Sequence, residues 1–158
     1  MDAKKVSDLF DRRLKRARKV NSGLQATLTI GQDSLFPKPR DYAFSAWDGE
    51  RSEIVFSPKV LSANLARVDA LIRHELSHAI LQHAGQEHTE AECDAVAERV
   101  FGDRIYYDAE DIQTINPKAP GARYPRPAYL PTGEIRRNAS HCGRREFCCG
   151  KCTGCPFQ

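Results

Sequence analysis

The chain has 158 residues, enough for one domain with an appendage, and its 41% hydrophobic content supports a modest core. No apolar run approaches the roughly 18 to 20 residues that span a bilayer, which argues against a membrane protein. The first 20 residues carry charges throughout and lack the apolar stretch of a secretion signal. We therefore expect a cytoplasmic protein that does not associate with membranes.

The net charge of +3 conceals an uneven distribution. Residues 1–20 hold eight Lys and Arg against three Asp and Glu, and residues 118–158 hold eight against two. Residues 21–117 are acidic, with eight basic side chains against sixteen acidic ones. Basic arms either keep a protein soluble or contact a polyanion, so nucleic acid is one candidate partner.

The first half of the chain predicts one helix and three strands. Residues 4–20 place apolar side chains, Val20 among them, at three- and four-residue spacing, as in an amphipathic helix. Residues 24–30 alternate between apolar and polar, which is typical of a strand. Residues 42–57 predict two more strands, joined by a turn at Asp48-Gly49.

Two further helices follow. Ser57-Pro58 predicts a short helical turn, and a long helix runs from there to about His83. Thr89 predicts the start of the next helix, which ends near Phe101. Together these elements predict an α+β fold with a small, mostly antiparallel sheet packed on the N-terminal helix and the long helix.

The composition changes after residue 116. Residues 117–134 contain five prolines, which exclude regular helix or strand and predict a linker. Residues 135–158 are rich in cysteine. We therefore divide the chain into a domain at 1–116, a linker at 117–134 and an irregular tail at 135–158.

The long helix carries the pattern H-E-x-x-H. His74 and His78 lie four residues apart, about 40° around the helix axis, so their rings project from the same face. Neutral imidazoles on adjacent turns can bind one Zn²⁺, and Glu75 lies beside them. The surrounding apolar residues predict a buried setting, and burying these groups without a role would cost several kcal/mol. The pattern therefore predicts a zinc site with Glu75 as general base.

A zinc site needs a third protein ligand, and five residues downstream could supply it: His83, His88, Glu90, Glu92 and Asp94. His83 lies roughly 140° further round the helix than His78, so it cannot easily reach the same ion. We interpret it as a partner of the helix C-terminus.

The helix after Thr89 favours one of the others. At about 100° per residue, Glu90 lies roughly 50° from the middle of the apolar face and Glu92 about 110°. Glu92 also fits a capping box with Thr89. Asp94 could accept a hydrogen bond from a ligand imidazole and fix its tautomer. We expect Glu90 as the third ligand, with His88 and Glu92 as alternatives.

These motifs resemble those of gluzincin metallopeptidases, whose second motif commonly reads E-x-x-A-D-x-x-A. Matched residue by residue, the resemblance implies that Glu90 is the third ligand, Asp94 the supporting aspartate and Ala97 the small residue. Cys93 stands where that family usually has alanine. The short spacer between His78 and Glu90 is similar to that of compact members such as the ImmA/IrrE-like group.

The order of elements before the motif also resembles the SprT-like group. That group uses a histidine as the third ligand, which would favour His88, and often carries a C-terminal zinc-binding module. The resemblance covers roughly residues 50–102 and implies a zincin fold.

Five of the six cysteines lie in the last seventeen residues. Cys142, Cys149, Cys152 and Cys155 are our preferred ligands for a second, structural zinc, since thiolates at this density suit a tetrahedral ion. Disulfides and free thiols are the alternatives.

The sequence favours a zinc-dependent endopeptidase that hydrolyses a protein or peptide through a Glu75-activated, zinc-bound water. By analogy, the strand at 52–57 could bind the substrate by β-augmentation. The oxyanion that forms when water attacks the peptide carbonyl needs support, and the sequence does not select among three candidates for it: Tyr106, Tyr107 and His88. The alternatives are a non-catalytic zincin-fold binding module and a SprT-like protease acting on DNA-bound proteins. The oligomeric state stays open.

Overall fold

The computed structural model describes residues 1–107 and residue 115. The linker and the Cys-rich tail, with the expected second zinc site at Cys142, Cys149, Cys152 and Cys155, lie outside the described residues. Within the described part, no helix is both long and apolar enough to cross a membrane.

Helix α1 spans Ala3–Ala17. The Asp2 side chain caps it by accepting a hydrogen bond from the Lys5 backbone N–H at 2.8 Å. Its inward face is apolar and buried, as the spacing predicts: Val6, Leu9, Phe10, Leu14 and Ala17. The helix ends three residues earlier than expected because a turn follows it, and Val20 is 42% exposed rather than part of the apolar face.

The sheet has three strands: β1 (Ala26–Ile30), β2 (Ala43–Trp47) and β3 (Ser52–Phe56). The spatial order is β1-β3-β2, with β1 parallel and β2 antiparallel to β3. The expectation of a mostly antiparallel sheet was therefore wrong, and the sheet is mixed. The cause is the connection after β1, which contains the short helix η1 (Asp33–Leu35) and carries the chain to the far side of β3.

The strand order also corrects the expected substrate strand. Residues 52–57 contain β3, which is hydrogen-bonded to a neighbour on each side and has no free edge for a peptide. Strand β2 is at the edge of the sheet, and among the described residues it pairs only with β3.

Two helical elements follow the sheet, and the second carries the H-E-x-x-H pattern. Ser57 caps the short helix η2 (Pro58–Ser62), and Asn64 caps helix α2 (Leu65–His83) by accepting a hydrogen bond from the Arg67 N–H at 2.8 Å. Helix α3 (Glu90–Phe101) follows after a short loop. It ends at Gly102, whose φ of 86° is a left-handed conformation that favours glycine.

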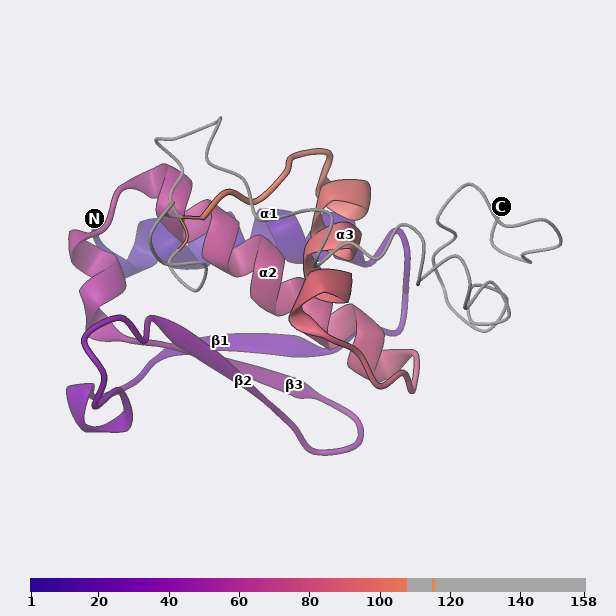
Figure 1. Cartoon of the computed structure of the whole chain (residues 1–158), viewed down its shortest axis with the longest axis horizontal. Coiled ribbons are helices and arrows are strands. Elements are labelled where there is room, and N and C mark those ends of the chain that lie inside the picture. The colour runs from indigo at the N-terminus through magenta and orange to yellow at the C-terminus, as the bar shows by residue number, and fades with distance from the viewer. Residues whose placement is uncertain (108–114, 116–158) are drawn as a thin grey trace, which may run out of the picture.

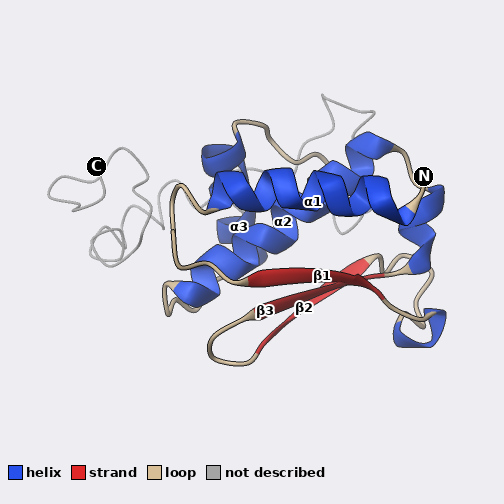
Figure 2. Cartoon of the chain, turned by 180° about the vertical axis from the view of Figure 1, so that it is seen from behind, coloured by secondary structure: helices blue, strands red, loops and turns tan. Residues whose placement is uncertain are grey.

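All three helices lie on one side of the sheet, and α2 runs across it (Figures 1 and 2). Helix α2 packs against α1, α3 and the sheet at once, which explains why most of its residues are buried. Ile54 and Phe56 of β3 are fully buried in one apolar cluster with Ile72, Leu76 and Ile80 of α2. Each such side chain contributes about 1.5–3 kcal/mol by burial. The described structure is thus a two-layer α+β fold built around the helix that carries the H-E-x-x-H pattern.

Candidate metal centre

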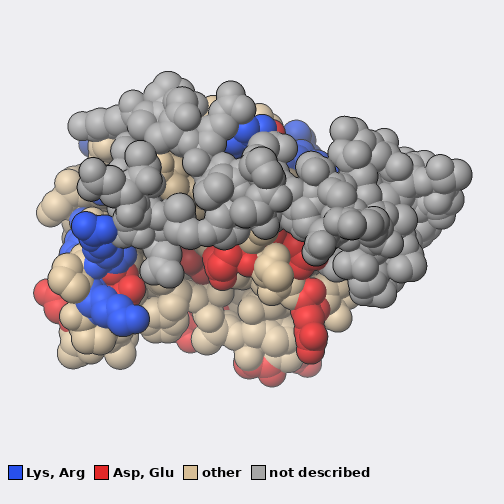
Figure 3. Space-filling model, in the orientation of Figure 1, with Lys and Arg blue, Asp and Glu red and all other residues tan. Residues whose placement is uncertain are grey.

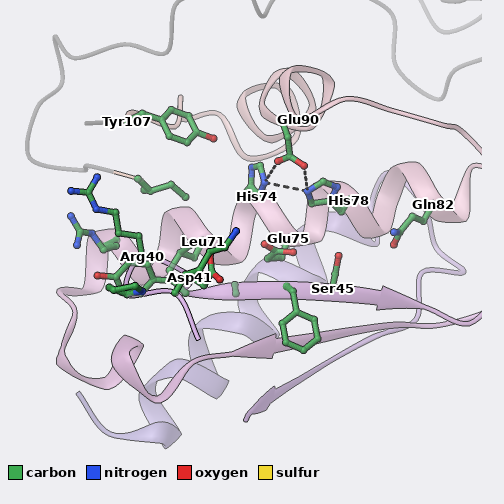
Figure 4. A pocket seen from close by; sticks show the side chains of 17 residues that line it. Arg40, Asp41, Ser45, Leu71, His74, Glu75, His78, Gln82, Glu90 and Tyr107 are labelled. Atoms are coloured by element: carbon green, nitrogen blue, oxygen red, sulfur yellow. Dashed lines mark hydrogen bonds and ion pairs between the residues drawn. The ribbon is translucent and has the colours of Figure 1, made fainter. Parts of the chain in front are cut away.

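Three side chains from two helices meet above the middle of α2 (Figure 4). The Nε2 atoms of His74 and His78, one turn apart, lie 3.2 Å from each other. The carboxylate of Glu90 spans both rings, with Oε2 at 2.8 Å from His74 Nε2 and Oε1 at 3.4 Å from His78 Nε2. The structure therefore brings together the two motif histidines and the glutamate expected as the third ligand.

The loop between α2 and α3 sets the position of Glu90. Gly85, with φ of 69°, turns the chain after α2, and Thr89 caps α3. The expected capping box is confirmed: Thr89 N–H donates to Glu92 at 2.9 Å, and Glu92 N–H donates to Thr89 at 3.2 Å. Glu92 is thereby committed to the cap, while Glu90, the first residue of the helix, faces the two imidazoles.

The other nitrogen of His74 faces a carboxylate, Asp94, that a tyrosine holds in place. His74 Nδ1 lies 3.0 Å from Asp94 Oδ1, and the Tyr107 hydroxyl donates to both Asp94 oxygens at 2.9 Å. Because a carboxylate can only accept, the Nδ1–H of His74 must donate to Asp94. The Nε2 of a neutral His74 is then a lone pair directed at Glu90 and His78.

His78 is held in the same tautomer by a different residue. His88 Nδ1 lies 2.9 Å from the backbone carbonyl of Gln86, so it donates there, and His88 Nε2 is an acceptor. His78 Nδ1 lies 2.8 Å from that acceptor and therefore donates to it. This hydrogen-bond chain directs the lone pair of His78 Nε2 toward His74 and Glu90.

Two imidazole lone pairs and a carboxylate thus converge on one point, which is unfavourable unless a cation lies between them. When no metal is bound, a proton on one of these groups can act as that cation. Burial acts against the charged form of His74, but hydrogen bonds to Asp94 and Glu90 outweigh it and raise its pKa well above the ordinary 6.5. Hydrogen bonds with His74 and His78 also hold the pKa of Glu90 well below its usual range.

The same point also suits zinc. Ligand atoms of a tetrahedral zinc with bonds of about 2.0–2.1 Å are separated by about 3.3 Å. The separations of 3.2 and 3.4 Å at His78 Nε2 are close to that value, and the third, 2.8 Å, is a hydrogen-bond length. Two histidines and a glutamate are a donor set that zinc accepts, with a further position left for water or substrate.

The alternative ligand His88 lies on the opposite side of the His78 ring. With His78 and Cys93 it forms a second group of metal-binding side chains that uses His78 Nδ1 instead of Nε2. Cys93 Sγ lies 3.0 Å from that nitrogen, and burial raises the pKa of its thiol well above the ordinary value, which disfavours a thiolate. The contacts of 2.8 and 3.0 Å are hydrogen-bond lengths, so this group orients the His78 ring.

Glu75 lies beside the ligand pair, between α2 and β2 (Figure 4). Its side chain is buried but lines a cleft of about 1040 Å³. The wall opposite α2 is formed by the loop before β2 and by β2 itself, including Ala43 and Ser45. The described residues contain no hydrogen-bond partner for the Glu75 carboxylate. A carboxylate in this position is available to take a proton from a molecule bound in the cleft.

The structure thus brings together Glu75, His74, His78, Glu90 and Asp94. His83 lies elsewhere, with its Nε2 at 3.2 Å from the Gln25 carbonyl and its ring against Trp47.

Sequence reasoning missed the roles of three residues. Tyr107 supports Asp94 instead of being a free candidate for the oxyanion, and His88 and Cys93 contact His78. Only one sequence feature pointed to any of these roles: Cys93 lies beside Asp94 on the apolar face of its helix. Nothing in the spacing of Tyr107 connects it to Asp94.

Comparison with known proteins finds no match for this chain among protein-family models, curated proteins or solved structures.

Proposed function

We propose that the chain is a zinc-dependent endopeptidase of the zincin type, with His74, His78 and Glu90 as metal ligands and Glu75 as general base. The observation that carries the proposal is the convergence of the two Nε2 atoms and the Glu90 carboxylate at 2.8–3.4 Å beside a buried carboxylate that lines a cleft. A purely structural zinc site would need neither the cleft nor Glu75, which disfavours the non-catalytic alternative.

The chemistry divides between the metal and the chain. Zinc, when bound, supplies a Lewis acid that polarises a carbonyl and lowers the pKa of water. Glu75 takes a proton from the water that attacks the peptide carbonyl and passes it to the leaving amine. Asp94 and His88 hold the two imidazoles in the tautomer that leaves each Nε2 free for the metal. For zinc to bind between them, Glu90 Oε2 and His74 Nε2 would have to separate from 2.8 Å to about 3.3 Å.

The substrate fits the cleft as an extended segment. A cleft of about 1040 Å³ is larger than a single side chain needs. Strand β2 is an edge strand along this cleft, so a peptide could add to it by main-chain hydrogen bonds. The cleft continues past the ligands in both directions, to Arg40 at one end and Gln82 at the other (Figure 4). A cleft that extends on both sides of the reacting bond supports endopeptidase action.

The test compares zinc-loaded wild type with Glu75→Gln on a disordered protein substrate. We expect cleavage that chelation abolishes and zinc restores, and a loss of about 100-fold or more in Glu75→Gln, as for removal of a general base. Zinc content should not change in this variant. The matched control is Glu53→Gln, an exposed glutamate on β3 that does not line the cleft.

Equal cleavage by wild type and Glu75→Gln would overturn the proposed mechanism. Zinc binding without cleavage by either protein would favour the non-catalytic alternative.

A further inference from the structure

One end of the cleft is basic. Lys38, Arg40 and Arg67 line it there, against a single acid, Asp41. On the face that Figure 3 shows, basic side chains lie at the left end next to some acidic ones, and mostly acidic side chains lie across the middle and lower right. Figure 4 shows Arg40 and Asp41 on the same side of the metal ligands, opposite Gln82. The two ends of the cleft therefore differ in charge.

Arg67 occupies a position in its helix where a cation is unfavourable. It is the third residue of α2, and the first turn of this helix contains no acidic residue. The N-terminus of a helix carries partial positive charge, so an arginine there is repelled. Helix α3 has a glutamate, Glu92, at the equivalent position. The N-terminus of α2 thus adds to the positive charge of this end of the cleft instead of compensating it.

The Arg67 side chain is also incompletely paired. Its guanidinium lies over the ring of Tyr42, with Cζ 5.8 Å from the ring centroid. Its Nε is buried and has no hydrogen-bond partner within the described residues. Buried N–H groups are nearly always paired, so the described residues leave this donor without the partner it would ordinarily have.

The distance from Arg67 to the metal ligands can be expressed in substrate residues. Arg67, Leu71, His74, His78 and Gln82 follow one another along the face of α2 that lines the cleft. His74 follows Arg67 by seven positions along the helix, which is about 10 Å at roughly 1.5 Å per residue. An extended peptide covers that distance in about three residues.

We propose that the Arg67 end of the cleft is a subsite for a substrate carboxylate, about three residues from the bond that is cleaved. The inference rests on the proposed peptidase function and adds a specificity to it. In a peptide the available anions are acidic side chains and the terminal carboxylate. The fork of a guanidinium matches a carboxylate in geometry, and Nε–H is one edge of that fork.

Binding tests this subsite without requiring catalysis. The probe is a set of fluorescent decapeptides, incubated with zinc-loaded Glu75→Gln protein, in which one glutamate moves along an otherwise neutral, C-terminally amidated sequence. A second set has a free C-terminus and no glutamate, which separates the two sources of carboxylate. We expect one peptide to bind roughly tenfold to hundredfold more tightly than its glutamine counterpart. Arg67→Gln should abolish that difference.

Two further variants serve as controls. Arg67→Lys retains the charge but loses the fork, so the preference should shrink without disappearing. Arg12→Gln removes an exposed helical arginine that does not line the cleft, and the preference should stay as in the parent protein. Thermal unfolding of each variant shows whether it is folded.

A second experiment measures cleavage. Wild type is incubated with a proteome-derived peptide library, and mass spectrometry of the products should show the same preference for a carboxylate near the cleaved bonds. Loss of cleavage with the binding preference intact would reject the peptidase function and leave the carboxylate site standing. Two results would overturn the proposal. One is that the zinc-loaded Glu75→Gln protein binds the glutamate peptides no more tightly than their glutamine counterparts, and the other is that the same preference persists when Arg67→Gln is added and the protein is folded.

Discussion

His78 Nδ1 lies 2.8 Å from His88 Nε2, so the residue that competed for the role of third ligand instead contacts one of the proposed ligands. The contact uses the ring nitrogen of His78 that faces away from His74 and Glu90. His88 therefore acts on the metal site through the tautomer and orientation of His78.

This relationship predicts the effect of replacing His88. His88→Phe removes the acceptor for His78 Nδ1–H, and we expect zinc affinity to fall about 10- to 100-fold while one zinc still binds at saturation. Affinity is measured by competition with a chromophoric chelator and stoichiometry by elemental analysis. If His88→Phe instead removed the zinc altogether, as His74→Ala should, His88 would be a ligand.

Variants of Glu90 and Glu92 should show that metal binding and helix capping depend on different residues. Glu90→Ala removes a proposed ligand, so zinc content at this site should be lost. Glu92→Ala breaks the capping box, and we expect a loss of about 1 kcal/mol in unfolding free energy with zinc affinity unchanged. Denaturant unfolding and zinc titration of both variants check the prediction, and loss of zinc in Glu92→Ala alone would contradict it.

Zinc affinity should rise with pH. The pKa of His74 is raised well above 6.5, so below that pKa its ring carries a proton that zinc must displace. Affinity is then lowest below that pKa, increases as pH rises toward it and levels off above it. Calorimetry in buffers of different ionisation enthalpy measures the protons released. An observed enthalpy independent of the buffer would count against this assignment.

The Cys-rich tail predicts a second zinc in the full chain. Wild type should contain two zinc ions, and a chain ending at residue 116 should contain one, because Cys142, Cys149, Cys152 and Cys155 would be absent. Cys149→Ser in the full chain should have the same effect. Purification under reducing conditions excludes disulfides, and one zinc in the reduced full chain would contradict the prediction.

Local sequence patterns predicted much of the described fold. The limits of α2 and α3 follow from residues close in sequence, such as the capping box of Thr89 and Glu92. The shared face of His74 and His78 follows from helix geometry alone. Periodicity also placed Glu90 on the side of α3 that faces α2, because the apolar face of α3 must pack on its neighbour. Its carboxylate does contact the two imidazoles, but its side chain is 67% exposed rather than turned into the core.

Other features depend on contacts between segments distant in sequence. Nothing in residues 26–56 specifies that β2 lies outside β3, because alternation predicts strands but not their order. The support of Asp94 by Tyr107 likewise needs the chain to return to α3 after Gly102.

By itself, then, the sequence determined the helices, the pair of histidines and the side of α3 from which Glu90 reaches them, because each depends on spacing within one or two turns. Only the tertiary structure decided which ring nitrogen each partner contacts, which strand borders the cleft and which end of the cleft is basic. Those properties arise where α2, α3 and the sheet meet, and the free energy that sets them comes from packing between elements, which no local pattern records.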